Sequence, residues 1–294
     1  MLPADVLRQI RRLQIRARRA VQTLLGGEYH SAFKGTGLSF EEVREYQPGD
    51  DVRSIDWNVT ARSNAPFIKR YVEERELTIL LAVDVSQSQR FGTQSHTKRT
   101  VAAELAALVA FCAAANNDRV GLVLFTDRIE RFVPPGKGTR HILRLLRDIL
   151  FHEPEGTGTD LPMALDHLNR AQKRRAIAFL LSDFQSKDYA DSLRRTARQH
   201  DLIAVKLGDP REAELPPVGL LNVEDAETGV QRLIDTNSRA LRQKFAANAE
   251  ARSREVRRTA RAAGADLIEV GTDGGHFESL LRFFRLREKR RRGK

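Results

Sequence analysis

Uninterrupted apolar runs alternate with amphipathic stretches along most of this chain, and the alternation predicts its elements. The run Leu77–Val83 is typical of a strand buried on both faces, as in a parallel sheet. Residues 97–116 follow it with apolar positions at helical spacing. The pattern continues with strands at 120–126, 175–182, 202–207 and 266–270, an antiparallel return at 128–133, a hairpin over 218–235, and helices at 139–151, 161–172, 188–199, 237–263 and 275–288. Strands that alternate with helices predict right-handed crossovers, and hence a doubly wound, mainly parallel α/β sheet.

The chain before this region has a different pattern. Residues 4–25 place apolar side chains along one stripe and arginines on the opposite face, which predicts a basic amphipathic helix that ends at Gly26-Gly27. Such a helix could lie on a membrane surface. Because no large aromatic residue marks an interfacial face, we expect the stripe to pack on the protein itself. We therefore predict an N-terminal helix-plus-β/loop extension at 1–76, the sheet domain at 77–284 and a basic tail at 285–294.

Charge is concentrated at the two ends of the chain. The 294 residues carry a formal net charge of +11, of which residues 1–20 contribute +5 and residues 282–294 contribute +7. The intervening part is therefore close to neutral. Basic ends could contact an anionic membrane surface, a nucleic acid or an acidic partner. No nucleic-acid-reading motif accompanies them, so we expect no specific nucleic acid and regard residues 285–294 as a solvated tail.

The apolar and cysteine content indicates the compartment. Cys112 is the only cysteine, which excludes an intrachain disulfide and fits a reducing environment. Its position in an apolar helix predicts a buried, unreactive thiol. The longest apolar run, 105–115, is too short to span a bilayer, and no signal-peptide core is evident. We expect a soluble, cytoplasmic protein.

The first strand of the sheet ends in polar residues that could bind a metal ion. The segment Asp84-Val85-Ser86-Gln87-Ser88 presents one carboxylate and two hydroxyls at spacing i, i+2, i+4. In open α/β sheets, ligands bind at the carboxyl ends of the strands. Oxygen donors without Cys or His favour Mg²⁺, Mn²⁺ or Ca²⁺ over zinc. A serine-rich loop that merely caps a helix is the alternative.

Two further segments strengthen the metal interpretation. The buried run 175–181 ends in Ser182-Asp183-Phe184, and the loop Gly156-Thr157-Gly158-Thr159-Asp160 opens a helix. Together, a strand followed by DxSxS, a loop threonine and a strand followed by Asp resemble the metal-ion-dependent adhesion site of the Rossmann-like von Willebrand A fold. The resemblance implies a metal site formed by Asp84, Ser86, Ser88, Thr159 and Asp183. Asp160 is expected to cap the helix that begins at Leu161.

Residues 35–76 contain a second distinctive block. It includes Arg44-Glu45-Tyr46-Gln47-Pro48-Gly49-Asp50-Asp51, then Ile55-Asp56-Trp57 and Thr60-Ala61-Arg62. Pro48-Gly49 predicts a type II turn, and the dense charges predict a paired network around Trp57. This block resembles the hallmark of the bacterial family called domain of unknown function 58. Membership implies a von Willebrand A-like domain and a partnership with MoxR-type AAA+ ATPases in chaperone-like maturation of other proteins.

Enzymatic signatures are missing from the sequence. There is no P-loop, zinc-protease His pair or Gly-x-Ser-x-Gly elbow, and Gly35-Thr36-Gly37 follows no predicted strand. A haloacid-dehalogenase-like phosphohydrolase would also begin with a strand-end Asp and Mg²⁺. It needs an acid/base Asp where this chain has Ser86, and serine cannot perform that proton transfer at neutral pH.

We therefore expect a non-enzymatic, metal-dependent protein-interaction module. Ser86 and Ser88 would bind Mg²⁺ or Mn²⁺ directly, Thr159 directly or through water, and Asp84 and Asp183 mainly through water. One position of the metal would remain exchangeable for an exposed Asp or Glu of a partner or client protein. The expected partner is a MoxR-type AAA+ ATPase. The alternative is a peripheral membrane or nucleic-acid binder that acts through its basic ends.

Overall fold

The chain folds into two compact units. In the computed structural model, the described residues are 10–17, 32–33, 39–63, 65–72, 76–93, 96–227 and 229–292. One unit contains Phe33–Leu77, and the other combines Met1–Ala32 with Thr78–Lys294. The amino-terminal helical residues 10–17 therefore belong with the sheet domain and not with the hallmark block, in contrast to the predicted division at residue 76.

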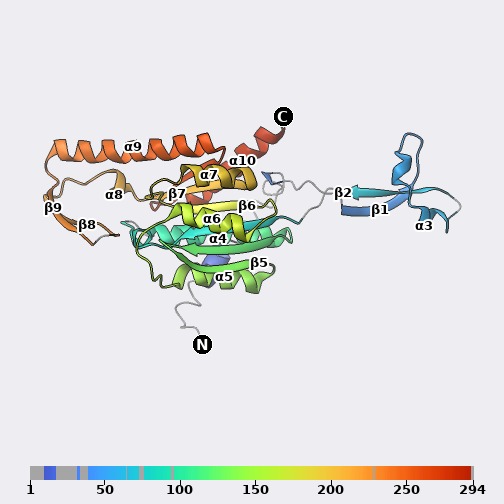
Figure 1. The fold of residues 1–294 in the computed structure, drawn as a ribbon, viewed down its shortest axis with the longest axis horizontal. Helices are drawn as coiled ribbons and strands as arrows, with labels where there is room; N and C mark the ends of the chain where they lie inside the picture. The colour runs from blue at the N-terminus through green and yellow to red at the C-terminus, as the bar shows by residue number, and fades with distance from the viewer. Residues whose placement is uncertain are drawn as a thin grey trace. The chain divides into compact units, whose positions relative to one another are not determined.

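The larger unit is built on a central, mostly parallel six-stranded sheet (Figure 1). Its strands follow the order β10-β7-β6-β3-β4-β5, in which only β5 runs antiparallel to its neighbour. The strands are β3 (Thr78–Asp84), β4 (Arg119–Phe125), β5 (Ile129–Gly136), β6 (Ile177–Ser182), β7 (Asp201–Gly208) and β10 (Asp266–Gly271). The sheet confirms the predicted α/β class, including the antiparallel return.

Helices cover both faces of the sheet (Figure 1). They are α4 (Lys98–Ala115), α5 (Thr139–Phe151), α6 (Leu161–Ala171), α7 (Ala190–Gln199), α9 (Arg239–Ala263) and α10 (His276–Arg292), with the short η2 (Gln87–Arg90) and α8 (Pro210–Ala213) in loops. Helix α4 contacts α5 and α10 on one face, whereas on the other face α7 contacts both α6 and α9. Because successive strand residues point to opposite faces, both sets of helices pack on apolar side chains.

Helix α4 and strand β3 lie in the core. Every residue of β3 after Thr78 is buried, which accounts for its uninterrupted apolar sequence. Helix α4 is buried nearly all round, from Lys98 to Ala113. Cys112 is a buried free thiol, as predicted, and burial raises its pKa to about 12.

The amphipathic N-terminal helix is described only at residues 10–17. There Ile10, Leu13 and Ala17 are buried, and Arg16 Nη1 lies 3.0 Å from Glu104 Oε1 on α4. This part of the helix packs on its own protein, as predicted. The rest of the predicted helix, with its end at Gly26-Gly27, lies outside the described residues.

The predicted C-terminal tail is largely helix. Helix α10 continues to Arg292, past the predicted helix end at 288, and takes in most of the predicted tail at 285–294. Arg287 pairs with Asp201 of β7 and Asp266 of β10, and Arg290 Nη1 lies 3.4 Å from Asp266 Oδ1. Part of the basic end therefore fastens α10 to the sheet through ion pairs. None of the described helices combines the length and hydropathy that a membrane crossing requires.

The smaller unit is a two-stranded sheet with short helices. It contains β1 (Ser39–Glu45), η1 (Val52–Ser54), α3 (Trp57–Thr60) and β2 (Phe67–Val72), with β1 antiparallel to β2. The Pro48-Gly49 turn has the positive φ of 108° at Gly49 that a type II turn requires.

The charged residues of the hallmark block do not gather around the tryptophan as expected. Trp57 is 69% exposed. Asp51 and Asp56 instead cap η1 and α3 by accepting backbone hydrogen bonds, and Asp50 Oδ1 pairs with Arg44 Nη2 at 2.7 Å. Local helix capping thus accounts for two of these carboxylates.

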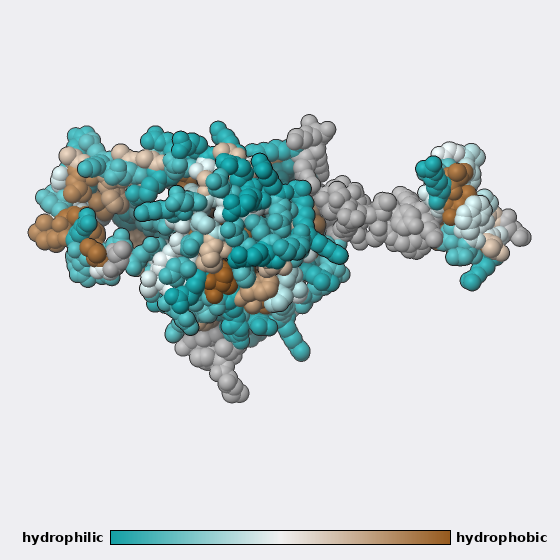
Figure 2. Space-filling view, viewed as in Figure 1, coloured by the Kyte–Doolittle hydropathy of each residue, from teal (hydrophilic) through white to brown (hydrophobic). Residues whose placement is uncertain are grey.

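A separate hairpin projects from the larger unit. Its strands β8 (Leu220–Glu224) and β9 (Gln231–Asp235) pair antiparallel, as predicted, and form a sheet of their own. Most of the surface in view is hydrophilic, but apolar side chains gather over this hairpin (Figure 2). Leu220 and Leu233 are more than 60% exposed there.

Candidate metal centre

The candidate site begins at the carboxyl end of β3, in the middle of the sheet. Asp84 closes β3 and is fully buried. Its Oδ1 accepts a hydrogen bond from the backbone N of Ser86 at 3.0 Å. The chain turns at this bond, and the Oγ atoms of Ser86 and Ser88 lie 3.1 Å apart. One carboxylate and two hydroxyls therefore meet at this strand end.

The neighbouring strand β6 adds a second carboxylate and another hydroxyl. Ser182 closes β6, and its Oγ donates to Asp84 Oδ2 over 2.6 Å. Asp183 follows, and its Oδ1 accepts from the backbone N of Gln185 at 3.2 Å. Phe184 has a φ of 60°, which is uncommon for a bulky side chain, and its backbone N donates to Ser182 Oγ. This left-handed residue turns the chain directly after Asp183.

The loop before α6 supplies Thr159. Its Oγ1 lies 3.4 Å from Asp84 Oδ2, a long hydrogen bond. The loop is tied to the β3 end because the backbone N of Gln87 donates to the carbonyl of Thr157 over 3.2 Å. Asp160 accepts from the backbone N of Met163 at 2.9 Å, which confirms the predicted cap of α6.

A glycine allows this loop to approach the sheet closely. A Cβ atom at Gly156 would lie 2.0 Å from Asp127 Oδ1 and 2.2 Å from Thr126 Oγ1, where no side chain fits. At Gly158 the nearest atom would be Glu227 Oε2, at 3.8 Å, which is ordinary contact. Gly156 is therefore the sterically required glycine of the Gly-Thr-Gly-Thr segment.

The two carboxylates shape the electrostatics of the site. Burial, and then the charge of Asp183, raise the pKa of Asp84 to about 7, although hydrogen bonds from Ser182 and Ser86 oppose the rise. The ionised form of Asp84 is therefore disfavoured in the folded protein, and a nearby cation would stabilise it.

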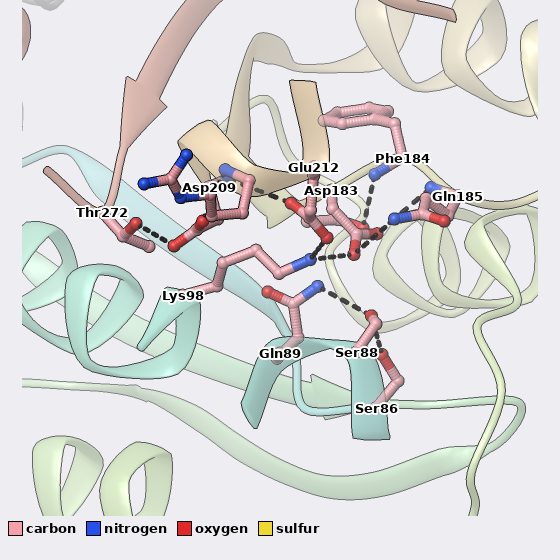
Figure 3. A network of polar contacts seen from close by, with 12 residues as sticks. Ser86, Ser88, Gln89, Lys98, Asp183, Phe184, Gln185, Asp209, Glu212 and Thr272 are labelled. Atoms are coloured by element: carbon pink, nitrogen blue, oxygen red, sulfur yellow. Dashed lines mark hydrogen bonds and ion pairs between the residues drawn. The ribbon is translucent and has the colours of Figure 1, made fainter. Parts of the chain in front are cut away.

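A lysine contacts the second carboxylate (Figure 3). Lys98 Nζ lies 2.7 Å from Asp183 Oδ2 and 2.6 Å from Glu212 Oε1. Burial alone would lower the pKa of Lys98, but Asp183 and Glu212 together raise it. Sequence reasoning missed this residue because a lysine in the first turn of a helix is normally solvated.

Two more side chains reach the site and were also missed. Gln89 is fully buried, and its Nε2 lies 3.4 Å from Ser88 Oγ, while its Oε1 has no hydrogen-bond partner among the described residues. Glu227, at the turn of the β8–β9 hairpin, hydrogen-bonds to the Thr159 side chain. Burial, and then Asp183, raise the pKa of Glu227. Neither residue carries a sequence signal that distinguishes it from a loop polar residue.

The donor set fits a hard divalent cation. Two carboxylates and three hydroxyls converge from three loops, and oxygen ligands of these kinds suit Mg²⁺ or Mn²⁺. The raised pKa of Asp84 shows that its ionised form lacks a stabilising cation among the described residues, and the buried Gln89 Oε1 lacks a hydrogen-bond donor among them. Both groups lie beside these oxygen ligands, where a bound cation or its water could serve them. Within the described ranges, no group of three or more His, Cys, Asp or Glu side chains could hold a metal ion. A centre at this place would therefore depend on hydroxyl oxygens.

All five residues selected from the sequence lie together at this strand edge. Asp84, Ser86, Ser88 and Thr159 are joined by hydrogen bonds, and Asp183 acts on Asp84 through its charge. Their role as metal ligands stays a prediction.

Comparison with known proteins identifies the family. Residues 42–255 match the family described as "Protein of unknown function DUF58". The chain belongs to this family. The DUF58 match spans the hallmark block, the candidate site and most of the sheet, in agreement with the predicted membership.

Relatives of this DUF58 chain occur in mycobacteria. "Uncharacterized protein Rv1480" of Mycobacterium tuberculosis is 36% identical over 287 residues, which cover 97% of this chain and 89% of the relative. "Uncharacterized protein Mb1516" of Mycobacterium bovis matches with the same identity and coverage.

Two solved structures from Bacteroides resemble the fold more remotely. An aerotolerance-related membrane protein of Bacteroides fragilis is 14% identical, with a TM-score of 0.47, and the match covers 71% of this chain and 99% of that one. The conserved hypothetical protein BatB of Bacteroides thetaiotaomicron is 15% identical, with a TM-score of 0.43, and the match covers 73% of this chain and 99% of BatB.

Proposed function

We propose that this protein is a non-enzymatic interaction module of von Willebrand A type, in which Asp84, Ser86, Ser88, Thr159 and Asp183 hold Mg²⁺ or Mn²⁺. The observation that carries the proposal is the fully buried Asp84 carboxyl, which lies within the electrostatic influence of Asp183 and contacts the hydroxyls of Ser182 and Thr159 at the carboxyl edge of a mostly parallel sheet. A bound divalent cation would supply an electrophilic position that accepts a carboxylate oxygen from another protein.

The residues of the chain divide the work by charge. The hydroxyls of Ser86, Ser88 and Thr159 offer neutral oxygens, so they bind a cation without cancelling its charge. Asp84 and Asp183 provide the negative charge that keeps the cation in place. Ser182 and the backbone N of Ser86 orient the Asp84 carboxylate through bonds of 2.6 and 3.0 Å. The exchangeable coordination position of the cation can accept a carboxylate oxygen from an Asp or Glu of the partner.

The proposed partner is a MoxR-type AAA+ ATPase, or a client protein with exposed acidic residues. This assignment rests on the family resemblance of the hallmark block. A binding role fits the site better than phosphoester hydrolysis, because Ser86 stands where the latter needs an acid/base carboxyl.

Three arginines of the basic ends already have acidic partners within the protein. Arg16, Arg287 and Arg290 make ion pairs with Glu104, Asp201 and Asp266, so these charges serve intramolecular contacts. A membrane or nucleic-acid surface would have to compete with those pairs.

The test is capture of the MoxR-type ATPase of the same organism by the purified chain. The ATPase is kept free of nucleotide, so that its own magnesium-nucleotide site does not contribute. Binding in Mg²⁺ that is lost in EDTA and with Asp84→Asn supports the proposal. Asp160→Asn, which alters a neighbouring cap, is the matched control and should still bind. Capture that is equal for all variants and insensitive to EDTA would overturn the metal bridge.

A further inference from the structure

Lys98 occupies an unusual place for a lysine. It is the first residue of α4, and its side chain is completely buried. The first turn of a helix favours anions, so the helix itself gives a cation no stabilisation there. A buried ammonium persists only when it is paired and hydrogen-bonded. The carboxylates of Asp183, which follows β6, and of Glu212, in the short helix α8, meet this requirement.

The second partner of the lysine is itself held firmly (Figure 3). Glu212 Oε2 accepts from the backbone N of Asp209 at 3.0 Å in the capping box of α8. Asp209 in turn accepts from Thr93 Oγ1 at 2.6 Å and from Thr272 Oγ1 at 2.5 Å. Glu212 therefore offers the ammonium a fixed position beside Asp183.

Lys98 thus already supplies one positive charge to the carboxylates of the candidate metal centre. Asp183 Oδ2 lies 2.7 Å from Lys98 Nζ. Among the described residues, Asp84 contacts a backbone N and side-chain hydroxyls but no cation. A divalent ion that binds between the two aspartates would meet the repulsion of the ammonium at short range. At distances of a few ångströms inside a protein, such a repulsion is much stronger than it would be in water.

We propose that Lys98 is a built-in counter-ion that sets the affinity of the site for divalent cations, by competing with them for Asp183. The inference rests on the proposed function. With the ammonium in place, Asp183 is neutralised without a metal, and the metal is held weakly enough to exchange. When a metal engages Asp183, Glu212 retains the ammonium, so the lysine stays buried and paired.

The proposal is tested by titrating the full chain with Mn²⁺ alone and measuring free Mn²⁺ by electron paramagnetic resonance. Lys98→Met removes the charge but keeps the length of the side chain, and it is expected to bind Mn²⁺ at least about tenfold more tightly than wild type. Lys244→Met removes one charge from an exposed position on α9 and should leave the affinity unchanged. A gain in Mn²⁺ affinity by Lys98→Met is informative because damage to the structure would lower the affinity.

The remaining outcomes decide between the two proposals. Should Lys98→Met fail to fold, Glu212→Gln serves instead: it leaves the ammonium to Asp183 alone and is expected to weaken Mn²⁺ binding severalfold. The counter-ion role is overturned if Lys98→Met binds Mn²⁺ as wild type does or more weakly. It is also overturned if Glu212→Gln binds Mn²⁺ as wild type does or more tightly. In that case, loss of Mn²⁺ binding with Asp84→Asn would still support the metal site. If Asp84→Asn binds like wild type, the proposed function fails as well.

Discussion

The hydroxyl of Ser182 lies 2.6 Å from Asp84 Oδ2 and joins the carboxyl ends of β6 and β3 inside the sheet. Both residues are fully buried. The same hydroxyl accepts the backbone N of Phe184 at 3.1 Å, so one side chain orients the Asp84 carboxyl and also fixes the turn that carries Asp183. Ser182 therefore organises both aspartates of the candidate site.

Ser182→Ala is expected to lower the free energy of unfolding by about 2 kcal/mol, because it leaves a buried carboxyl and a backbone N–H without this partner. Urea denaturation of the metal-free protein measures the change. Ser192→Ala is the control. Ser192 is buried too, but its Oγ accepts a hydrogen bond from the exposed Arg195 side chain, which water can replace, and the loss should stay below about 1 kcal/mol. Equal effects of the two substitutions would contradict the role given to Ser182.

The pKa of Asp84 makes the metal-free protein sensitive to pH. The folded value of about 7 lies above the ordinary value of 3.8, so the folded state holds the proton more tightly than the unfolded state. The stabilisation is complete below pH 4 and is lost as the pH rises to about 7. Asp84→Asn, which cannot ionise, should lack this loss.

We therefore expect the stability of wild type relative to Asp84→Asn to fall between pH 4 and pH 7. Excess Mg²⁺ should restore much of it at pH 8 in wild type only, because a cation stabilises the ionised carboxylate. Thermal melts at pH 4, 6 and 8, with and without Mg²⁺, measure both effects. Parallel profiles for the two proteins would show that Asp84 ionises freely.

The two glycines of the loop before α6 should respond differently to alanine. Gly156→Ala places a Cβ atom 2.0 Å from Asp127 Oδ1, so the loop must shift, and we expect a cost of about 1–3 kcal/mol together with weaker Mn²⁺ binding through displaced Thr159. Gly158→Ala meets nothing closer than 3.8 Å and serves as the matched control. Equilibrium unfolding and Mn²⁺ titration measure the pair. Similar behaviour of the two variants would refute the steric argument.

Glu227 faces other carboxylates across the site. Burial, followed by the charges of Asp183, Asp225 and Asp127, raises its pKa, against a hydrogen bond with Thr159. The ionised form is therefore disfavoured in the folded state. Glu227→Gln should melt at a slightly higher temperature than wild type at pH 8 and at the same temperature at pH 4, because only the charged form is repelled.

Saturating Mn²⁺ should reduce the difference in melting temperature between Glu227→Gln and wild type at pH 8, because a cation between the carboxylates offsets their repulsion. Glu224→Gln is the control on the same hairpin, since Glu224 Oε2 is held by Gln231 Nε2 at 2.8 Å. A destabilised Glu227→Gln at pH 8 would mean that the Thr159 contact outweighs the repulsion.

The sequence predicted the sheet domain well because its signals are local. The apolar runs before Asp84 and Asp183 mark buried strands, and strand ends in a parallel sheet meet at one edge, so the convergence of these residues could be expected. The Gly-Thr-Gly-Thr loop and the cap at Asp160 are likewise short-range features. The antiparallel return and the β8–β9 hairpin followed from their turns.

The boundaries at the two ends were less predictable. Residues 10–17 join the sheet unit because Ile10, Leu13 and Ala17 find an apolar surface there, and the amphipathic pattern does not say which surface that is. The basic sequence at the end of α10 predicts a solvated tail. Arg287 instead pairs with Asp201 and Asp266, which lie 86 and 21 positions away.

By itself, the sequence determined the α/β alternation, the family and the cluster of strand-end oxygens. Periodicity, turn residues and motifs involve residues that are close together in the sequence, so they can be recognised without the structure. Only the tertiary structure decided the charge balance of that cluster. Lys98 reads as an ordinary helix-surface lysine until β6 and α8 bring Asp183 and Glu212 to its ammonium, from 85 and 114 positions away. Such contacts depend on how distant loops pack together, and electrostatic energy depends on that distance and on burial, neither of which is encoded locally.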